Sequence, residues 1–148
     1  MIFNVICLAF LIRCLSNFSW YWIVALPGTV VHEVLHFVAG LFTFAGPTKI
    51  QVTPVRTTNG EQTGVLGYVN FNNVNWFNAI PTALAPVLAI PFVIAWAGGN
   101  PNMGWFATWI CASVLSQTKP SQADFAVAFS KPLGIVFWIG LPMYLIFG

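Results

Sequence analysis

Charged residues are scarce in this chain. Only 5% of its 148 residues are charged, whereas 58% are hydrophobic and 16% are aromatic. Soluble domains carry about 25% charged residues, so this composition predicts an integral membrane protein. The chain has five basic residues and no two of them are adjacent, which excludes the basic patch of a nucleic-acid-binding protein. These residues are Arg13, Lys49, Arg56, Lys119 and Lys131.

Cysteine is also scarce, and its spacing carries no motif. Cys7, Cys14 and Cys111 lie in apolar segments without C-x-x-C spacing or a nearby histidine. We interpret them as small hydrophobic side chains and not as metal ligands or a disulfide framework. No internal repeat or low-complexity tract divides the chain, so we expect one domain over residues 1–148.

Long apolar segments predict the fold class, an all-α polytopic membrane protein with about four to five transmembrane helices. The segments cover residues 1–15, 18–44, 76–96, 103–115 and 125–147. We expect the first to be a retained helix, because no basic residue precedes it and no A-x-A-like site follows it. Pro27-Gly28 predicts a kink or a restart within the second segment. Lys131-Pro132 predicts a break in the last one.

The polar stretch between the second and third apolar segments has a strand-like pattern. Residues 49–53 alternate between polar and apolar, residues 65–71 are rich in β-formers, and Asn59-Gly60 is a turn signal between them. We expect a small membrane-associated β-hairpin inserted at about 48–72. Five asparagines follow or end this stretch, and we interpret them as a solvated or interfacial edge. They are Asn70, Asn72, Asn73, Asn75 and Asn78.

The only two histidines of the chain lie four residues apart, as His32-Glu33-x-x-His36. On a helix this spacing places both imidazoles on one face, where they can share a zinc ion. Glu33 would then lie beside the open position as the general base for a water molecule. Two core histidines bonded to backbone carbonyls are the structural alternative. Ionisable groups in a membrane helix are costly and usually functional, which favours the metal site.

A catalytic zinc site needs a third protein ligand. Apart from Glu33, the only acids are Glu61 and Asp124. Glu61 follows the turn signal, where a solvated charge is expected, whereas Asp124 lies at a predicted membrane boundary. We therefore favour Asp124 as the third ligand. Ser121-x-x-Asp124 is also typical of a helix capping box, and both roles can coexist.

The basic residues predict which side of the membrane the site is on. If segments 76–96 and 103–115 each cross once, loops 45–75 and 118–131 lie on the same side. These loops hold four of the five basic residues, and the loop 98–102 holds none. The positive-inside bias places both loops in the cytosol, so we expect the metal within the membrane, nearer its cytosolic face.

These motifs resemble the site-2 protease family of intramembrane zinc metalloproteases. That family pairs H-E-x-x-H on one transmembrane helix with an Asp near a later one, as His32, His36 and Asp124 would. Gly67-Tyr68-Val69 resembles the G-Y-V of the family's membrane-associated β segment, and Ala85-Pro86 resembles its Gly-Pro.

The chain also departs from the family pattern. Ser116, Pro120 and Phe125 replace the Asn-Pro-rich approach to the Asp and the Gly after it. The family's Asn after Gly-Pro is absent, because residues 87–89 are Val-Leu-Ala. A substrate-contacting role is therefore not transferred to that region.

The resemblance implies an intramembrane zinc metalloendopeptidase with Zn²⁺ as cofactor, His32, His36 and Asp124 as ligands and Glu33 as base. Its substrate would be a transmembrane or membrane-associated protein, unwound and added as a strand to the hairpin edge. The candidate strand residues are Val65, Gly67, Tyr68 and Val69. We expect the protein to lie in the lipid bilayer. The identity of any regulatory membrane partner stays open.

Two other classes of function stay open. The first is a catalytically silent zinc-binding membrane regulator or adaptor, in which the fourth zinc position would be closed to water. The second is a metal or ion transporter, which would show further intramembrane acids along a path.

Overall fold

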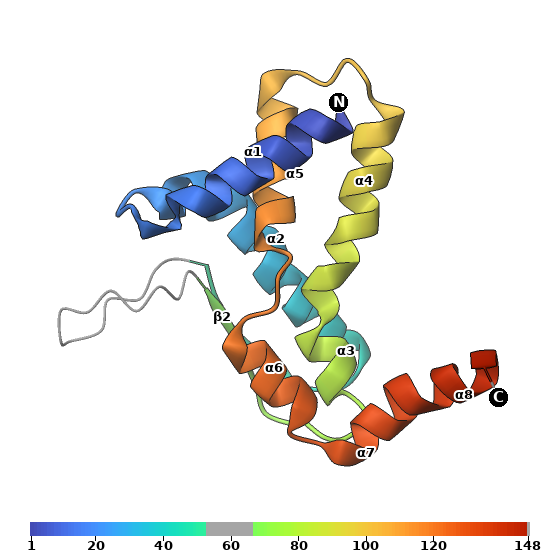
Figure 1. The fold of residues 1–148 in the computed structure, drawn as a ribbon. Helices are drawn as coiled ribbons and strands as arrows, with labels where there is room; N and C mark the ends of the chain where they lie inside the picture. The colour runs from blue at the N-terminus through green and yellow to red at the C-terminus, as the bar shows by residue number, and fades with distance from the viewer. Residues whose placement is uncertain (53–66, 148) are drawn as a thin grey trace.

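The computed structural model describes residues 1–52 and 67–147. It is mostly helical (71%), and its described residues form one two-stranded antiparallel sheet, which confirms the predicted mainly helical fold with a small strand pair (Figure 1). The elements are α1 (Ile2–Cys14), the 3-10 turn η1 (Leu15–Asn17), α2 (Tyr21–Phe42), β1 (Pro47–Gln51), β2 (Tyr68–Phe71), α3 (Ala79–Ala83), the 3-10 turn η2 (Ala85–Leu88), α4 (Ala89–Gly99), α5 (Trp105–Gln117), α6 (Gln122–Phe129), α7 (Pro132–Ile135), the π-helical turn η3 (Val136–Gly140) and α8 (Leu141–Phe147).

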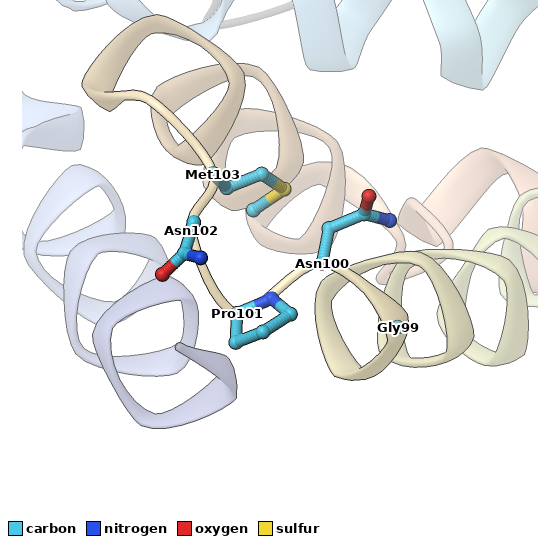
Figure 2. Close-up of a pocket in the computed structure, with 5 residues that line it drawn as sticks. All are labelled: Gly99, Asn100, Pro101, Asn102 and Met103. Carbon is cyan, nitrogen blue, oxygen red and sulfur yellow. The ribbon is translucent and has the colours of Figure 1, made fainter.

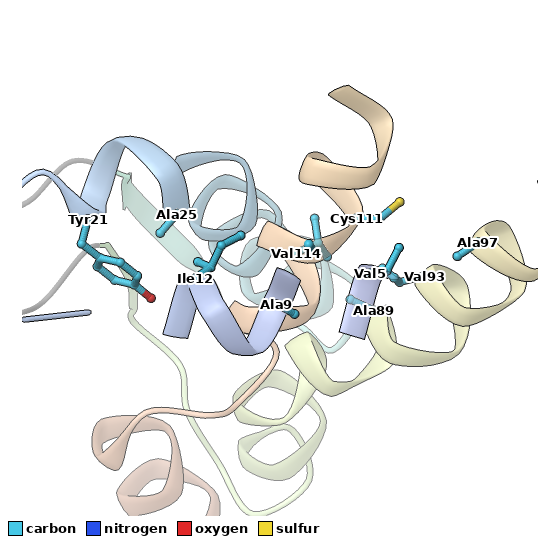
Figure 3. Packing of buried hydrophobic residues seen from close by; sticks show 11 residues of the cluster. Val5, Ala9, Ile12, Tyr21, Ala25, Ala89, Val93, Ala97, Cys111 and Val114 are labelled. Carbon is cyan, nitrogen blue, oxygen red and sulfur yellow. The ribbon is translucent and has the colours of Figure 1, made fainter. Parts of the chain in front are cut away.

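The core lies between α1, α2, α4 and α5, and much of it consists of small side chains. Figure 3 shows Ala9, Ala25, Ala89 and Ala97 turned toward neighbouring helices among larger residues such as Ile12. Small residues allow helix backbones to approach closely, which is typical of helix contacts in membranes. Cys111 is part of this core, as its interpretation as a small hydrophobic residue predicts.

Of the kink or restart predicted at Pro27-Gly28, the restart is wrong, because helix α2 runs without a break through Pro27. The physical reason is that α5 bonds to the backbone at this point. The Gly28 N–H donates to Ser113 Oγ at 2.9 Å, and the Trp109 indole N–H donates to the Val24 carbonyl at 3.2 Å. A proline is tolerated inside a helix where a neighbouring helix bonds to the surrounding backbone, as α5 does here.

The single helix predicted over residues 76–96 is divided in the structure. It begins at Ala79 as α3, passes through the 3-10 turn η2 at Pro86, and continues as α4 to Gly99. A proline has no N–H and clashes with the preceding turn, so an α-helix does not continue through this position unchanged. The division leaves α3 as a separate short helix beside α2.

The asparagine-rich connection between the sheet and α3 is not simply a solvated edge. Asn78 is fully buried, which contradicts that interpretation for this residue. Its Nδ2 donates to the Thr43 carbonyl at 3.3 Å and to the Asn73 carbonyl at 2.8 Å, and its Oδ1 accepts from the Asn75 N–H at 2.7 Å. A buried amide must be bonded, and these bonds join the end of α2, the segment after β2 and the start of α3.

The predicted break at Lys131-Pro132 is confirmed, because α6 and the helix over 132–147 meet at 90°. Among the described residues only α2 is by itself long and apolar enough to cross a membrane, and this bent pair would add a second span at most. With 13 residues, α5 is about 20 Å long, less than the bilayer core of about 30 Å. Four to five transmembrane helices therefore stay a prediction.

The contact between α2 and α5 generates the first test. A Cβ added at Gly28 would lie 2.1 Å from the Ser113 carbonyl oxygen, which is backbone and cannot rotate away. We expect Gly28→Ala to lower the free energy of unfolding by about 1–3 kcal/mol, measured by thermal or denaturant unfolding. Gly99→Ala is the control, because nothing lies within 4 Å of its Cβ position. Equal stability of the two variants would contradict the tight contact.

Candidate metal centre

His32 and His36 lie one turn apart on α2, with their rings edge to face and their centroids 4.7 Å apart. Their Nε2 atoms are 3.0 Å apart. The two imidazoles therefore share one face of the helix and point their outer nitrogens at the same place, as the four-residue spacing predicts.

Each histidine is oriented by a backbone carbonyl from another element. His32 Nδ1–H donates to the carbonyl of Gln117 at the end of α5, at 2.6 Å, and His36 Nδ1–H donates to that of Thr82 in α3, at 2.8 Å. A carbonyl only accepts hydrogen bonds, so Nδ1 carries a proton in both rings, and in the neutral imidazole Nε2 then presents a lone pair. This is the arrangement that metal-binding histidines usually have.

The carboxylate of Asp124 completes the cluster from the first turn of α6. Ser121 and Asp124 form the predicted capping box, in which Oδ2 accepts the Ser121 N–H at 2.6 Å and Ser121 Oγ accepts the Asp124 N–H at 3.1 Å. Asp124 Oδ1 lies 3.2 Å from His36 Nε2, and Oδ2 lies 3.7 Å from His32 Nε2. The cap thus holds the carboxylate against both histidines.

Two imidazole lone pairs and a carboxylate converge here, with the three candidate ligand atoms within 4.8 Å of one another. Such a set needs a cation between its members, either a proton or a metal ion, because acceptors alone repel. Zinc–nitrogen bonds of about 2.0–2.1 Å in a tetrahedron place ligand atoms about 3.3 Å apart. The two Nε2 atoms are 3.0 Å apart, and two different oxygens of Asp124 lie 3.2 Å from His36 Nε2 and 3.7 Å from His32 Nε2. The chemistry of the three side chains therefore suits zinc, and their separations are near this value without matching it.

The position of these groups in the fold also favours a cation. Gln117 is the last residue of α5, so the negative end of that helix dipole faces His32. His36 is buried, whereas the side chains of His32 and Asp124 are 13% and 17% exposed. This leaves one side of the cluster accessible to water.

Glu33 lies beside the strand that the sequence predicts to receive substrate. It is 5% exposed, and an added Cβ at Gly67 would be 2.8 Å from its Oε1 and 2.7 Å from the Gln51 carbonyl oxygen. The chain just before β2 therefore passes in contact with the Glu33 carboxylate, and only glycine fits there. Of the two acids considered as the third ligand, Asp124 lies in the cluster with the histidines. Glu61 lies outside the described residues. Val65 also lies outside them.

Sequence reasoning missed Gln117 and Thr82, the residues that orient the histidines. They act through backbone carbonyls, which every residue type has, so no residue pattern identifies them. A hollow lined by residues 99–103 (Figure 2) lies at the opposite end of α5 from Gln117 and has no titratable side chain, so it is not a rival site.

No model of a protein family matches this chain, and neither a curated protein nor a solved structure matches it. The resemblance to the site-2 protease family therefore rests on the sequence motifs alone. The chemistry of the site must be inferred from its own geometry.

We expect the wild-type protein to retain about one zinc ion per chain, and Asp124→Ala to lose it, measured by elemental analysis after dialysis. Asp124→Asn should also lose zinc, because its amide supplies no anionic oxygen. Its side-chain oxygen can still accept the Ser121 N–H, so the helix cap is kept. Ser121→Ala is the matched control. It removes the hydroxyl of the cap but keeps the carboxylate and the Ser121 N–H bond that orients it. Zinc loss in Ser121→Ala equal to that in Asp124→Ala would assign Asp124 a capping role only.

Proposed function

We propose that the protein is an intramembrane zinc metalloendopeptidase. The observation that carries this proposal is the convergence of His32 Nε2, His36 Nε2 and the Asp124 carboxylate on one point. Glu33 follows His32 directly on the same helix. Three protein ligands with one accessible side are typical of a catalytic zinc site, whereas structural sites have four protein ligands.

The residues have separate roles in this proposal. His32, His36 and Asp124 would hold the zinc ion, which lowers the pKa of water and polarises a carbonyl when bound. Glu33 accepts a proton from the attacking water and later donates it to the leaving amine. The Gln117 and Thr82 carbonyls keep the two imidazoles in the ligand orientation.

The sheet would present the substrate. A helical substrate must be unwound first, because its carbonyls are bonded within its own helix. An unwound segment can then add to the edge of β1 or β2 through backbone bonds. The contact between Gly67 and Glu33 supports this role, because it places the start of β2, with Tyr68 and Val69, beside the proposed base.

A membrane location is part of the proposal. Large apolar side chains are widely exposed, with Phe3 of α1 and Phe92 of α4 each 74% exposed and Trp105 of α5 81% exposed. Soluble monomers rarely expose contiguous apolar surface on this scale. Lipid would cover these side chains, and local thinning of the bilayer would accommodate the short α5. Lys49, Lys119 and Lys131 flank the segments around the site, which supports a site nearer the cytosolic face.

The alternatives have less support. A silent zinc-binding regulator would have no use for a buried acid beside both the ligands and the strand. In the described part of the chain, Glu33 and Asp124 are the only acids and both are at this one site, so no acidic pathway for a transported ion is present.

Glu33→Gln tests the catalytic role. We expect it to lower cleavage of labelled single-span peptides in liposomes by at least about 100-fold while zinc stays bound, because the amide keeps the shape but cannot accept a proton. A chelator should abolish wild-type cleavage, and added zinc should restore it. Cleavage by Glu33→Gln near the wild-type rate would exclude Glu33 as the base. Zinc binding without cleavage by the wild type would favour the silent regulator.

The two ends of α5 provide a test of the proposed topology. Asn102 and Lys119 are exposed at its opposite ends. In a background with the three cysteines replaced by alanine, we expect a membrane-impermeant maleimide to label Lys119→Cys from the cytosolic side and Asn102→Cys from the other side. Labelling of both from the same side would contradict the crossing by α5.

A further inference from the structure

The two residues whose carbonyls orient the histidines share a second property. Each is tied by its own side chain to an end of α2, the helix that carries both histidines. Gln117 Nε2–H donates to the Tyr21 hydroxyl at 2.6 Å, and Tyr21 is the first residue of α2. Thr82 Oγ1 lies 3.0 Å from Oγ1 of Thr43, the C-cap of α2. We call these contacts the Tyr21–Gln117 tie and the Thr43–Thr82 tie.

The Tyr21–Gln117 tie fixes a backbone group that has no partner within its own helix. Gln117 is the last residue of α5, and the final carbonyls of a helix have no intrahelical donor. Helix ends fray readily, so this carbonyl would be the least ordered acceptor of the site. Tyr21 is 6% exposed and Gln117 is partly buried, so the tie is shielded from water mainly on the Tyr21 side.

The Thr43–Thr82 tie does the same for His36. Thr43 Oγ1–H donates to the Ala39 carbonyl at 2.7 Å, so in this pair Thr82 Oγ1–H is the donor and Thr43 Oγ1 the acceptor. Thr82 is 1% exposed and belongs to α3, a helix of only five residues. So short a helix does not hold its own orientation without outside contacts.

We propose that Tyr21, Gln117, Thr43 and Thr82 are positioning residues that set the tautomer of the two histidines. The ties hold each carbonyl where it accepts an Nδ1–H, so that both Nε2 atoms keep their lone pairs toward the metal. None of these side chains touches the metal or the substrate. The inference rests on the metal site of the proposed function and does not depend on proteolysis.

The test removes one hydroxyl at a time, with Tyr21→Phe and Thr82→Val, and measures zinc affinity by competition with a chelator. Loss of groups that orient metal-binding histidines usually weakens metal binding 10–100-fold, and we expect about tenfold for each variant because the side chain acts through a carbonyl. Tyr144→Phe and Thr108→Val are the matched controls. They make the same changes at an exposed residue of α8 and at the start of α5, away from the site, and should leave affinity unchanged.

The tautomers supply a second measurement that a general loss of stability would not reproduce. In metal-free protein, ¹⁵N resonances of the imidazoles should show the Nε2–H form gaining population at His32 only in Tyr21→Phe and at His36 only in Thr82→Val. If Tyr21→Phe does not fold, Gln117→Met interrupts the same tie from α5. If Thr82→Val does not fold, Thr43→Val does so from α2.

The outcomes separate this inference from the proposed function. Absence of zinc binding by the wild type would overturn the proposed function and the inference with it. Wild-type zinc affinity and unchanged tautomers in both variants would overturn the inference alone. Weaker binding with the histidine-specific change in tautomer is the expected result.

Discussion

The close approach of α2 and α5 at Gly28 is the constraint on which the site depends. Because Gly28 has no side chain, the α5 backbone at Ser113 can lie against α2, and the Ser113 hydroxyl accepts the Gly28 N–H. One helical turn further along both helices, this contact places the last carbonyl of α5 beside His32. The apolar core and the candidate metal ligands are therefore not independent, since the packing of small residues sets the distance between a histidine and the group that orients it.

The polar groups of the site are consistent with a cation between them, either a proton or a metal ion. The Nε2 atoms of the two imidazoles face each other and the Asp124 carboxylate, which also accepts the Ser121 N–H. The surrounding hydrogen bonds hold the three side chains in this orientation. The Gln117 and Thr82 carbonyls take the Nδ1 protons, and the Ser121 N–H orients the carboxylate.

The sequence predicted the parts of the structure that depend on residue type and spacing. The four-residue spacing of His32 and His36 and the capping pattern at Ser121 are local, and both are present. The continuity of α2 through Pro27 was not predictable, because it depends on bonds from α5. The burial of Asn78 likewise depends on where α2 and β2 end. The pairing of each histidine with a carbonyl far along the chain is a tertiary contact between backbone groups, for which residue identity carries no signal.

The arrangement of rigid and accessible parts around the site follows from the same contacts. His36 and the residues that orient it are buried, whereas His32 and Asp124 are partly exposed, so the cluster is fixed on its inner side and open on its outer side. Glu33 faces the chain at Gly67, where a side chain would displace either the acid or the strand. A substrate strand added to this sheet would therefore be held against a fixed backbone beside the acid, and the position of its carbonyl would be set by the sheet and not by its own side chains.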